Sequence, residues 1–87
     1  MFEIFLDTPA KNFIKKLDSK NGQRIIKAIE KLAEDPIPHD AKRIYGTNEK
    51  LFRIRVGDFR VLYRIDYEKI IIIVVDIDSR KRVYREM

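Results

Sequence analysis

The sequence predicts a small α+β fold, namely a mostly antiparallel sheet with an N-terminal helical hairpin packed on one face, in the order β-α-α-β-β-β. Apolar residues recur with helical spacing between residues 8 and 35, and they alternate with strand spacing over residues 51–63. Residues 70–77 are almost continuously apolar and β-branched, which is typical of a central strand covered on both faces. A chain of 87 residues has room for one domain, which we expect to span residues 1–87.

One strand and two helices are expected in the N-terminal part. Residues 2–6 are apolar nearly throughout, and Thr8 then serves as a helix N-cap with Pro9 at the first helical position. Residues 18–22 form a polar connection between two helical apolar stripes, and the second helix must end near Asp35 because prolines follow it. A connection of about five residues makes the two helices antiparallel neighbours.

A β-hairpin over residues 51–63 is the most distinctive feature of the sequence. A two-residue loop at 57–58 with Gly first suits a type II′ turn, and this register places Arg55 directly opposite Arg60. A short strand at 41–46 precedes the hairpin. Like charges that face each other across a ladder are destabilising, and we expect no carboxylate on this face to offset them. An anionic ligand would explain the arrangement.

Net charge is concentrated in the second part of the chain. Residues 1–41 carry seven Lys+Arg and seven Asp+Glu, whereas residues 42–87 carry twelve and seven, which accounts for the net charge of +5. Eight of the nine arginines lie in the second part, and guanidinium groups recognise phosphate through several planar donors. A charge-rich surface of the kind found in thermophiles is the alternative explanation.

Composition also excludes several kinds of protein. There is no Cys, and a zinc site or a Ser/His/Asp triad built on the single His39 is a poor candidate. The N-terminus lacks the basic region of a signal peptide, and the longest apolar run, residues 70–75, is too short to span a bilayer. We therefore expect a cytoplasmic protein with no membrane segment, no metal and no cofactor.

Two runs of sequence resemble a known family. Residues 51–65, Leu-Phe-Arg-Ile-Arg-Val-Gly-Asp-Phe-Arg-Val-Leu-Tyr-Arg-Ile, and residues 71–84, Ile-Ile-Ile-Val-Val-Asp-Ile-Asp-Ser-Arg-Lys-Arg-Val-Tyr, are similar to the RelE family of toxin–antitoxin ribonucleases, within the RelE/ParE superfamily. The resemblance covers essentially the full chain. It implies a ribosome-dependent endoribonuclease, or mRNA interferase, that cleaves mRNA in the A site, inhibits translation and is silenced by a RelB-like antitoxin. The implied reaction uses the substrate 2′-hydroxyl, leaves a 2′,3′-cyclic phosphate and needs no metal.

The same resemblance implies catalytic roles for Arg53, Arg55, Arg60, Arg80 and Tyr84. Arg60 and Arg80 suit stabilisation of a phosphorane, and Tyr84 suits stacking on a base. Further RNA-binding residues are expected at Lys42, Arg43, Arg64 and Arg82. The general base stays open, because arginine remains protonated. Either Arg55 acts electrostatically, or a nearby Lys, Tyr84 or ribosomal RNA supplies the base.

Two alternatives stand beside the nuclease. The first is a ParE-like inhibitor of DNA gyrase, and retention of the five residues implied to be catalytic argues against it. The second is a non-catalytic RNA-binding or antitoxin-binding module. Arginine at both lysine-type positions, Arg53 and Arg55, and Ser79 where many relatives place a His, keep this alternative open.

Overall fold

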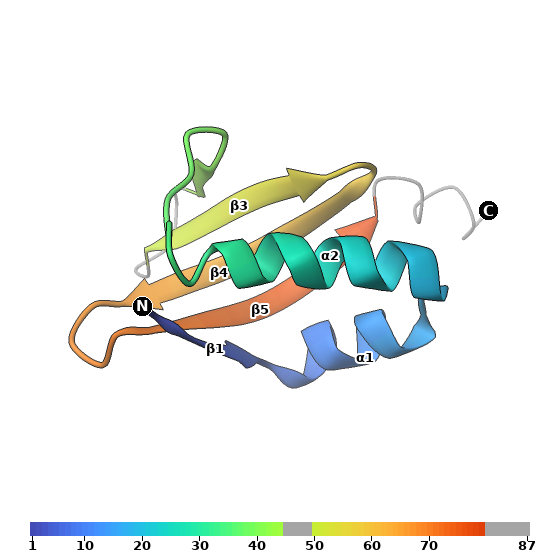
Figure 1. The fold of residues 1–87 in the computed structure, drawn as a ribbon, viewed down its shortest axis with the longest axis horizontal. Coiled ribbons are helices and arrows are strands. Elements are labelled where there is room, and N and C mark those ends of the chain that lie inside the picture. The colour runs from blue at the N-terminus through green and yellow to red at the C-terminus, as the bar shows by residue number, and fades with distance from the viewer. Residues whose placement is uncertain (45–49, 80–87) are drawn as a thin grey trace.

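The computed structural model describes residues 1–44 and 50–79, which form two helices and five strands (Figure 1). The elements in chain order are β1 (Glu3–Leu6), α1 (Thr8–Lys16), α2 (Ser19–Lys31), β2 (Lys42–Ile44), β3 (Leu51–Val56), β4 (Phe59–Asp66) and β5 (Ile71–Ser79). The strands make one sheet in the order β1-β5-β4-β3-β2. The pair β1 and β5 is parallel, and the other neighbours are antiparallel.

The predicted α+β class and mostly antiparallel sheet are confirmed, although the sheet is mixed. The short strand predicted at 41–46 is confirmed by β2 at the edge of the sheet, as far as the described residues reach. The predicted order β-α-α-β-β-β is one strand short, because it gives four strands where the sheet has five. The last strand begins at Ile71, one residue later than expected. Ile70 belongs to the preceding turn, where its φ of 56° is incompatible with an extended strand.

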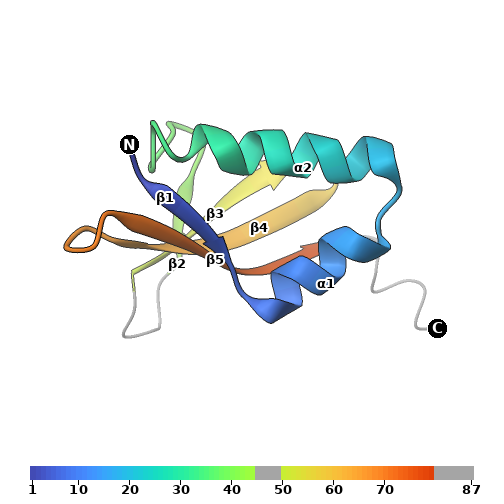
Figure 2. The same ribbon diagram turned by 60° about the horizontal axis from the view of Figure 1, so that its bottom comes forward.

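Both helices contribute to one core on the same side of the sheet. Figure 1 shows α2 lying across the front of the strands, and Figure 2 shows the sheet beneath it. Ala10 of α1 and Ile25 and Ile29 of α2 belong to the buried cluster that includes Val61 and Ile72 of the sheet. Each helix therefore buries the apolar stripe that its sequence predicts.

The connection between the helices is shorter than predicted. The Asp18 carboxylate accepts hydrogen bonds from the backbone N–H of Asn21 at 3.1 Å and from its side-chain amide at 2.9 Å, so Asp18 is the N-cap of α2. These contacts, the backbone N–H first, lower the pKa of Asp18. The predicted connection over residues 18–22 is wrong, because the helix starts at Ser19 and continues through Gly22. The N-cap of α1 is likewise Asp7 and not Thr8.

Tyr63 anchors the segment that follows α2 to the middle of the sheet. Its side chain is fully buried, and its hydroxyl donates a hydrogen bond to the carbonyl oxygen of Pro36 at 2.7 Å. Burial, followed by the carboxylates of Asp35 and Asp40, raises the pKa of Tyr63. The hydroxyl therefore keeps its proton and remains a donor.

A register shift between β4 and β5 decides which way the side chains of β5 point. Tyr63 pairs with Val74, but the adjacent Leu62 pairs with Asp76. Val75 is therefore the extra residue of a β-bulge. Side chains on the two sides of such a bulge follow opposite alternations.

The bulge turns two carboxylates away from the core. Ile72 and Val74 are buried under the helices before the bulge, and Ile77 is buried after it. Asp76 and Asp78 flank Ile77, so they point to the other face of the sheet. Strict alternation from Ile72 would have directed both carboxylates into the core.

The tip of the hairpin adopts the turn that the sequence predicts. Gly57 has a φ of 61°, and Ile70 is the only other positive-φ residue in the described part of the chain. A positive φ at the first turn position alone is typical of a type II′ turn. A Cβ added to Gly57 would lie 2.7 Å from Nη2 of Arg24, whereas one added to Gly22 would meet no atom within 4 Å.

The two glycines should therefore respond oppositely to the same substitution. Gly57→Ala is expected to lower the free energy of unfolding by about 1–2 kcal/mol, because an L-residue is strained at this φ. Gly22→Ala should raise it by roughly 0.5–1 kcal/mol, because Ala is the better helix former. Urea unfolding of both variants measures the two values, and a change of the same sign in both would contradict the described geometry.

Candidate nucleic-acid interface

The face of the sheet that points away from the helices carries most of the cations predicted to bind RNA. We define the arginine face as eight of the outward side chains of β2 to β5, namely Lys42, Arg53, Arg55, Arg60, Leu62, Arg64, Asp76 and Asp78. By the same register, Ile44, Leu51, Asp66, Ile71 and Ile73 also lie on this side of the sheet. Their chain neighbours Ile54, Val61 and Ile77 are buried in the core. Side chains alternate along a strand, so the arginine face lies on the opposite side.

The strand register aligns these side chains in two rows across the sheet. One row contains Arg55, Arg60 and Asp78. The second row contains Lys42, Arg53, Leu62 and Asp76. Each row therefore runs from cations on the hairpin side to a carboxylate on β5.

Both rows place a cation directly opposite another cation. Arg55 faces Arg60 across the β3–β4 ladder, as the sequence predicts, and Lys42 faces Arg53 across the β2–β3 ladder. A two-residue turn makes Arg55 and Arg60 a non-hydrogen-bonded pair, in which Cα atoms approach to about 4.5 Å. In the ranges 1–44 and 50–79, neither Arg53 nor Arg55 makes a side-chain hydrogen bond or ion pair. The arrangement concentrates positive charge that an anionic ligand would relieve.

Arg60 is held by Asp78. Its Nε donates to Oδ1 at 3.0 Å and its Nη2 donates to Oδ2 at 3.2 Å, and the two residues are directly paired across β4 and β5. The expectation that this face has no carboxylate is therefore wrong. The reason is the bulge at Val75, which brings Asp78 outward. The sequence signal for this carboxylate was the Asp-Ile-Asp alternation that follows a continuous apolar run.

The remaining predicted RNA-binding residues do not all share the arginine face. Lys42 lies on it, and Arg64 lies on it opposite Ile73. Arg43 pairs with Phe52 and lies on the helix side of the sheet, where its guanidinium carbon is 6.0 Å from the centre of the Phe52 ring. The other three predicted residues lie outside the described residues; they are Arg80, Arg82 and Tyr84. Their roles stay predictions.

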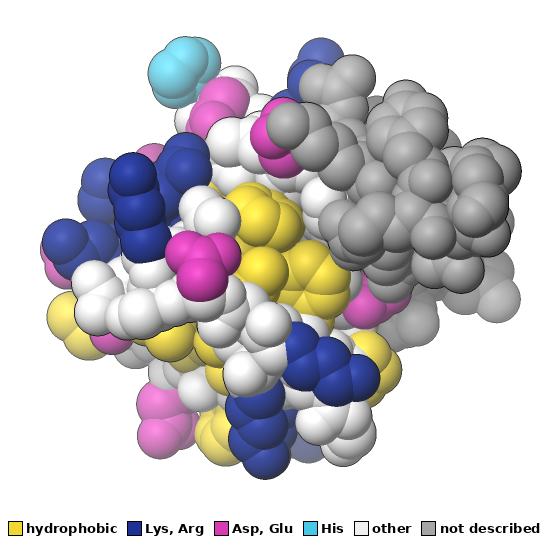
Figure 3. Space-filling model, turned by 90° about the vertical axis from the view of Figure 1, so that its right-hand side faces the viewer, with side chains coloured by type: hydrophobic (Ala, Val, Ile, Leu, Met, Phe, Trp, Pro, Cys, Tyr) yellow, Lys and Arg dark blue, Asp and Glu magenta, His cyan; other side chains and the backbone are white. Residues whose placement is uncertain are grey.

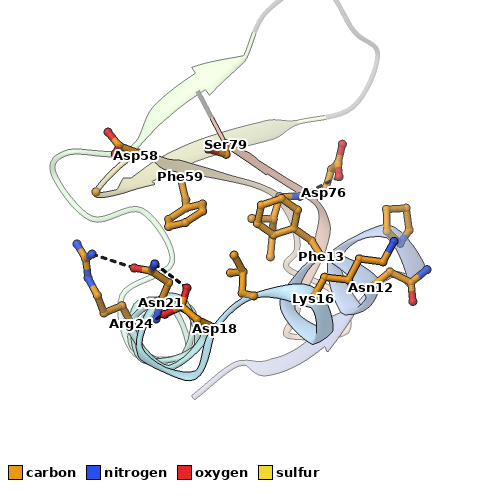
Figure 4. A pocket seen from close by; sticks show the side chains of 14 residues that line it. Asn12, Phe13, Lys16, Asp18, Asn21, Arg24, Asp58, Phe59, Asp76 and Ser79 are labelled. Atoms are coloured by element: carbon orange, nitrogen blue, oxygen red, sulfur yellow. Dashed lines mark hydrogen bonds between the residues drawn. The ribbon is translucent and has the colours of Figure 1, made fainter. Parts of the chain in front are cut away.

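A groove on the helix side of the sheet shares only Asp76 with the arginine face. It has a volume of about 740 Å³ and lies where both helices meet the β3–β4 turn. Figure 3 looks at this end of the molecule and shows hydrophobic side chains in a hollow, with Lys and Arg to its left and below it and Asp or Glu side chains beside it. In Figure 4, Phe13 and Phe59 lie at the centre of this groove, with their rings 5.9 Å apart in an edge-to-face arrangement. Its border includes Lys16, Arg24 and three carboxylates, those of Asp18, Asp58 and Asp76. This mixed charge does not suit a phosphate backbone.

Two further properties of the described ranges concern metals and membranes. No three His, Cys, Asp or Glu side chains gather there in the way a metal ion requires. No helix in this part of the chain has the length and apolarity needed to cross a membrane.

Comparison with known proteins assigns the family. A family model described as the ParE toxin of the type II toxin-antitoxin system, parDE, matches residues 4–84. A protein of Methanocaldococcus jannaschii that carries the name toxin RelE1 is 36% identical over an alignment of 75 residues, and the match covers 83% of this chain and 82% of that protein.

Solved structures share the fold. RelE in the RelE–RelB complex of Pyrococcus horikoshii OT3 has a TM-score of 0.80 and 22% identity, covering 93% of this chain and 97% of that one. Isolated E. coli RelE has a TM-score of 0.74 and 21% identity, and the match covers 99% of this chain and 94% of that one. The fold and the sequence matches together define a toxin of a type II toxin–antitoxin system. Within that class, the chain belongs to the RelE/ParE superfamily and is RelE-like.

If the arginine face is arranged for a ligand and not for stability, removal of one opposed cation should stabilise the protein. Arg55→Gln is expected to raise the free energy of unfolding by roughly 0.2–1 kcal/mol at low salt. The gain should shrink near 1 M salt, where the Debye length is about 3 Å. Urea unfolding at both salt concentrations measures the effect, with the exposed helix residue Lys27 changed to Gln as the control. Loss of stability in Arg55→Gln at low salt would contradict this account.

Proposed function

We propose that this toxin is a ribosome-dependent endoribonuclease that cleaves mRNA in the A site and so inhibits translation. The observation that carries the proposal is the arginine face, where two pairs of opposed cations lie on a sheet surface that neither helix covers. Such a surface matches the regularly spaced phosphates of a nucleic acid and provides planar donors for them. The RelE names of the related proteins support the same activity.

The proposed reaction needs only charge stabilisation and proton transfer. The 2′-hydroxyl oxygen of the substrate attacks phosphorus, and the bond from phosphorus to the 5′-oxygen breaks. The hydroxyl proton passes to a base, and the departing 5′-oxygen takes up a proton, so the products are a 2′,3′-cyclic phosphate and a 5′-hydroxyl. Arg60 faces the scissile phosphate in this proposal, because fixed cations are most effective where negative charge develops.

Arg53 and Arg55 contribute charge along the message backbone in this proposal. Arg80 and Tyr84, which follow β5 in the sequence, are the further residues proposed for the site. Arg80 would share the phosphorane charge with Arg60, and Tyr84 would stack on a base. No arginine can serve as the base at neutral pH. The base is therefore a nearby Lys, Tyr84 or ribosomal RNA, which also explains why the ribosome has to align the message.

A RelB-like antitoxin is the proposed partner. The RelE of Pyrococcus horikoshii was solved in a complex with RelB, and this chain shares its fold. A short chain with an acidic segment would neutralise the arginine face, where cations oppose cations. The proposed site of action is the cytoplasm, where the ribosome and mRNA are.

Cleavage should depend on Arg60. Purified protein added to translating ribosomes is expected to produce cuts at A-site codons, mapped by primer extension. Arg60→Ala should reduce the cleavage rate by about 100-fold or more, in line with removal of a donor to a developing charge. Lys27→Ala changes a cation on the helix side and should cut at the native rate.

A message that stays intact with the native protein would contradict the nuclease. The family model names ParE, and this favours gyrase inhibition as the second candidate function. Gyrase inhibition would then replace the nuclease as the proposed function if the protein abolished DNA supercoiling by gyrase with no ribosome present.

RNA binding should also depend steeply on salt. For a single strand, the slope of log K against log salt is about −0.7 for each phosphate contacted. Three contacting arginines therefore predict a slope near −2, and Arg53→Gln should make it less steep by about 0.7. Fluorescence anisotropy with a 2′-O-methyl oligonucleotide measures binding without cleavage. A slope that does not change with salt or with this substitution would contradict the arginine face as the RNA surface.

A further inference from the structure

Asp78 restrains Arg60 at two points. Its two carboxylate oxygens accept separate hydrogen bonds from Nε and Nη2 of Arg60, at 3.0 and 3.2 Å. Two parallel hydrogen bonds to a planar group fix both its position and its plane. The side chains of Arg60 and Asp78 are 34% and 25% exposed, so the guanidinium still reaches the surface.

The contact leaves a second edge of the guanidinium directed away from Asp78. The group has five N–H donors, and the edge formed by Nε and Nη2 uses two of them. Nη1 and the other hydrogen of Nη2 form a second edge, which can bind two phosphate oxygens. Because Asp78 fixes the plane of Arg60, it also fixes the direction of this second edge.

Three arginines of the arginine face differ in restraint: Asp78 holds Arg60, whereas the described residues leave Arg53 and Arg55 unrestrained. Arg53 and Arg55 have no ion pair or side-chain hydrogen bond within 1–44 and 50–79. Long unrestrained cations suit the capture of a flexible backbone. A restrained cation suits a contact in the transition state, because preorganised charge needs no rearrangement as the phosphorane forms.

We propose that Asp78 is a positioning residue of the nuclease site, which orients Arg60 so that the outer edge of its guanidinium meets the non-bridging oxygens of the scissile phosphate. The inference rests on the proposed function for the identity of that phosphate. Asp78 acts through Arg60 and does not touch the RNA. The competing explanation is that Asp78 only neutralises Arg60 and therefore weakens its attraction for phosphate.

A double-mutant cycle on RNA binding separates the two explanations without any cleavage. The four proteins are the native chain, Arg60→Ala, Asp78→Asn and the double variant, and the ligand is a 2′-O-methyl oligonucleotide. If Asp78 positions Arg60, Arg60→Ala weakens binding by a factor at least about threefold larger in the native background than in the Asp78→Asn background. If Asp78 only neutralises, the larger factor appears in the Asp78→Asn background. Equal or reversed factors overturn the proposal.

Cleavage on ribosomes supplies the second readout, with Glu30→Gln as the control. Glu30 is an exposed carboxylate on α2, which packs against the opposite face of the sheet. Asp78→Asn should lower the cleavage rate constant at saturation by about tenfold or more, with little change in the half-saturating concentration. Glu30→Gln should retain the native rate. Equal rates for these two variants overturn the proposal.

The unfolding midpoint of each variant is measured first, and Arg60→Gln replaces Arg60→Ala if the alanine variant does not fold. If the native protein cuts no message, the proposed function is contradicted, and the binding cycle alone decides the role of Asp78.

Discussion

The two hydrogen bonds between Arg60 and Asp78 join β4 to β5 at the place where the hairpin sets one arginine against another. An ion pair with this much exposure contributes only about 0–1 kcal/mol to stability, so it is not what holds the sheet together. Its effect is to let Arg60 stay beside Arg55 in a defined orientation. Without Asp78, the β3–β4 ladder would carry an unrelieved pair of like charges at its closest spacing.

The two faces of the sheet differ: one packs against the helices, and the other carries the Arg60–Asp78 pair. The core face is apolar, and both helices pack against it. The buried Tyr63 has a hydrogen-bond partner for its hydroxyl, the carbonyl oxygen of Pro36. The other face carries charged side chains because neither helix packs on it. The bulge at Val75 connects the two, since it keeps Ile77 in the core while it moves Asp78 beside Arg60. One extra residue thus supplies the carboxylate that the arginine face needs.

Local patterns predicted the hairpin and the helical stripes because each depends on residues close in the chain. The register of Arg55 with Arg60 followed from one two-residue turn with Gly57 in a left-handed conformation. The carboxylate at Asp78 did not follow, because a bulge is set by packing between strands and strict alternation gives the wrong face. The start of α2 was missed because Asp18, a polar residue in an apparent connection, is an N-cap. The side of Arg43 depends on its pairing with Phe52, which the sequence of β2 alone does not reveal.

The most direct test of the account is the structure of this toxin on a translating ribosome whose message carries a 2′-O-methyl group at the A site and so cannot be cut. The arginine face is expected to lie against the message, with Arg60 contacting a phosphate between two A-site nucleotides and both helices turned away from it. A complex in which the helices or the groove around Phe13 and Phe59 meet the message, while the arginine face points to solvent, would contradict it.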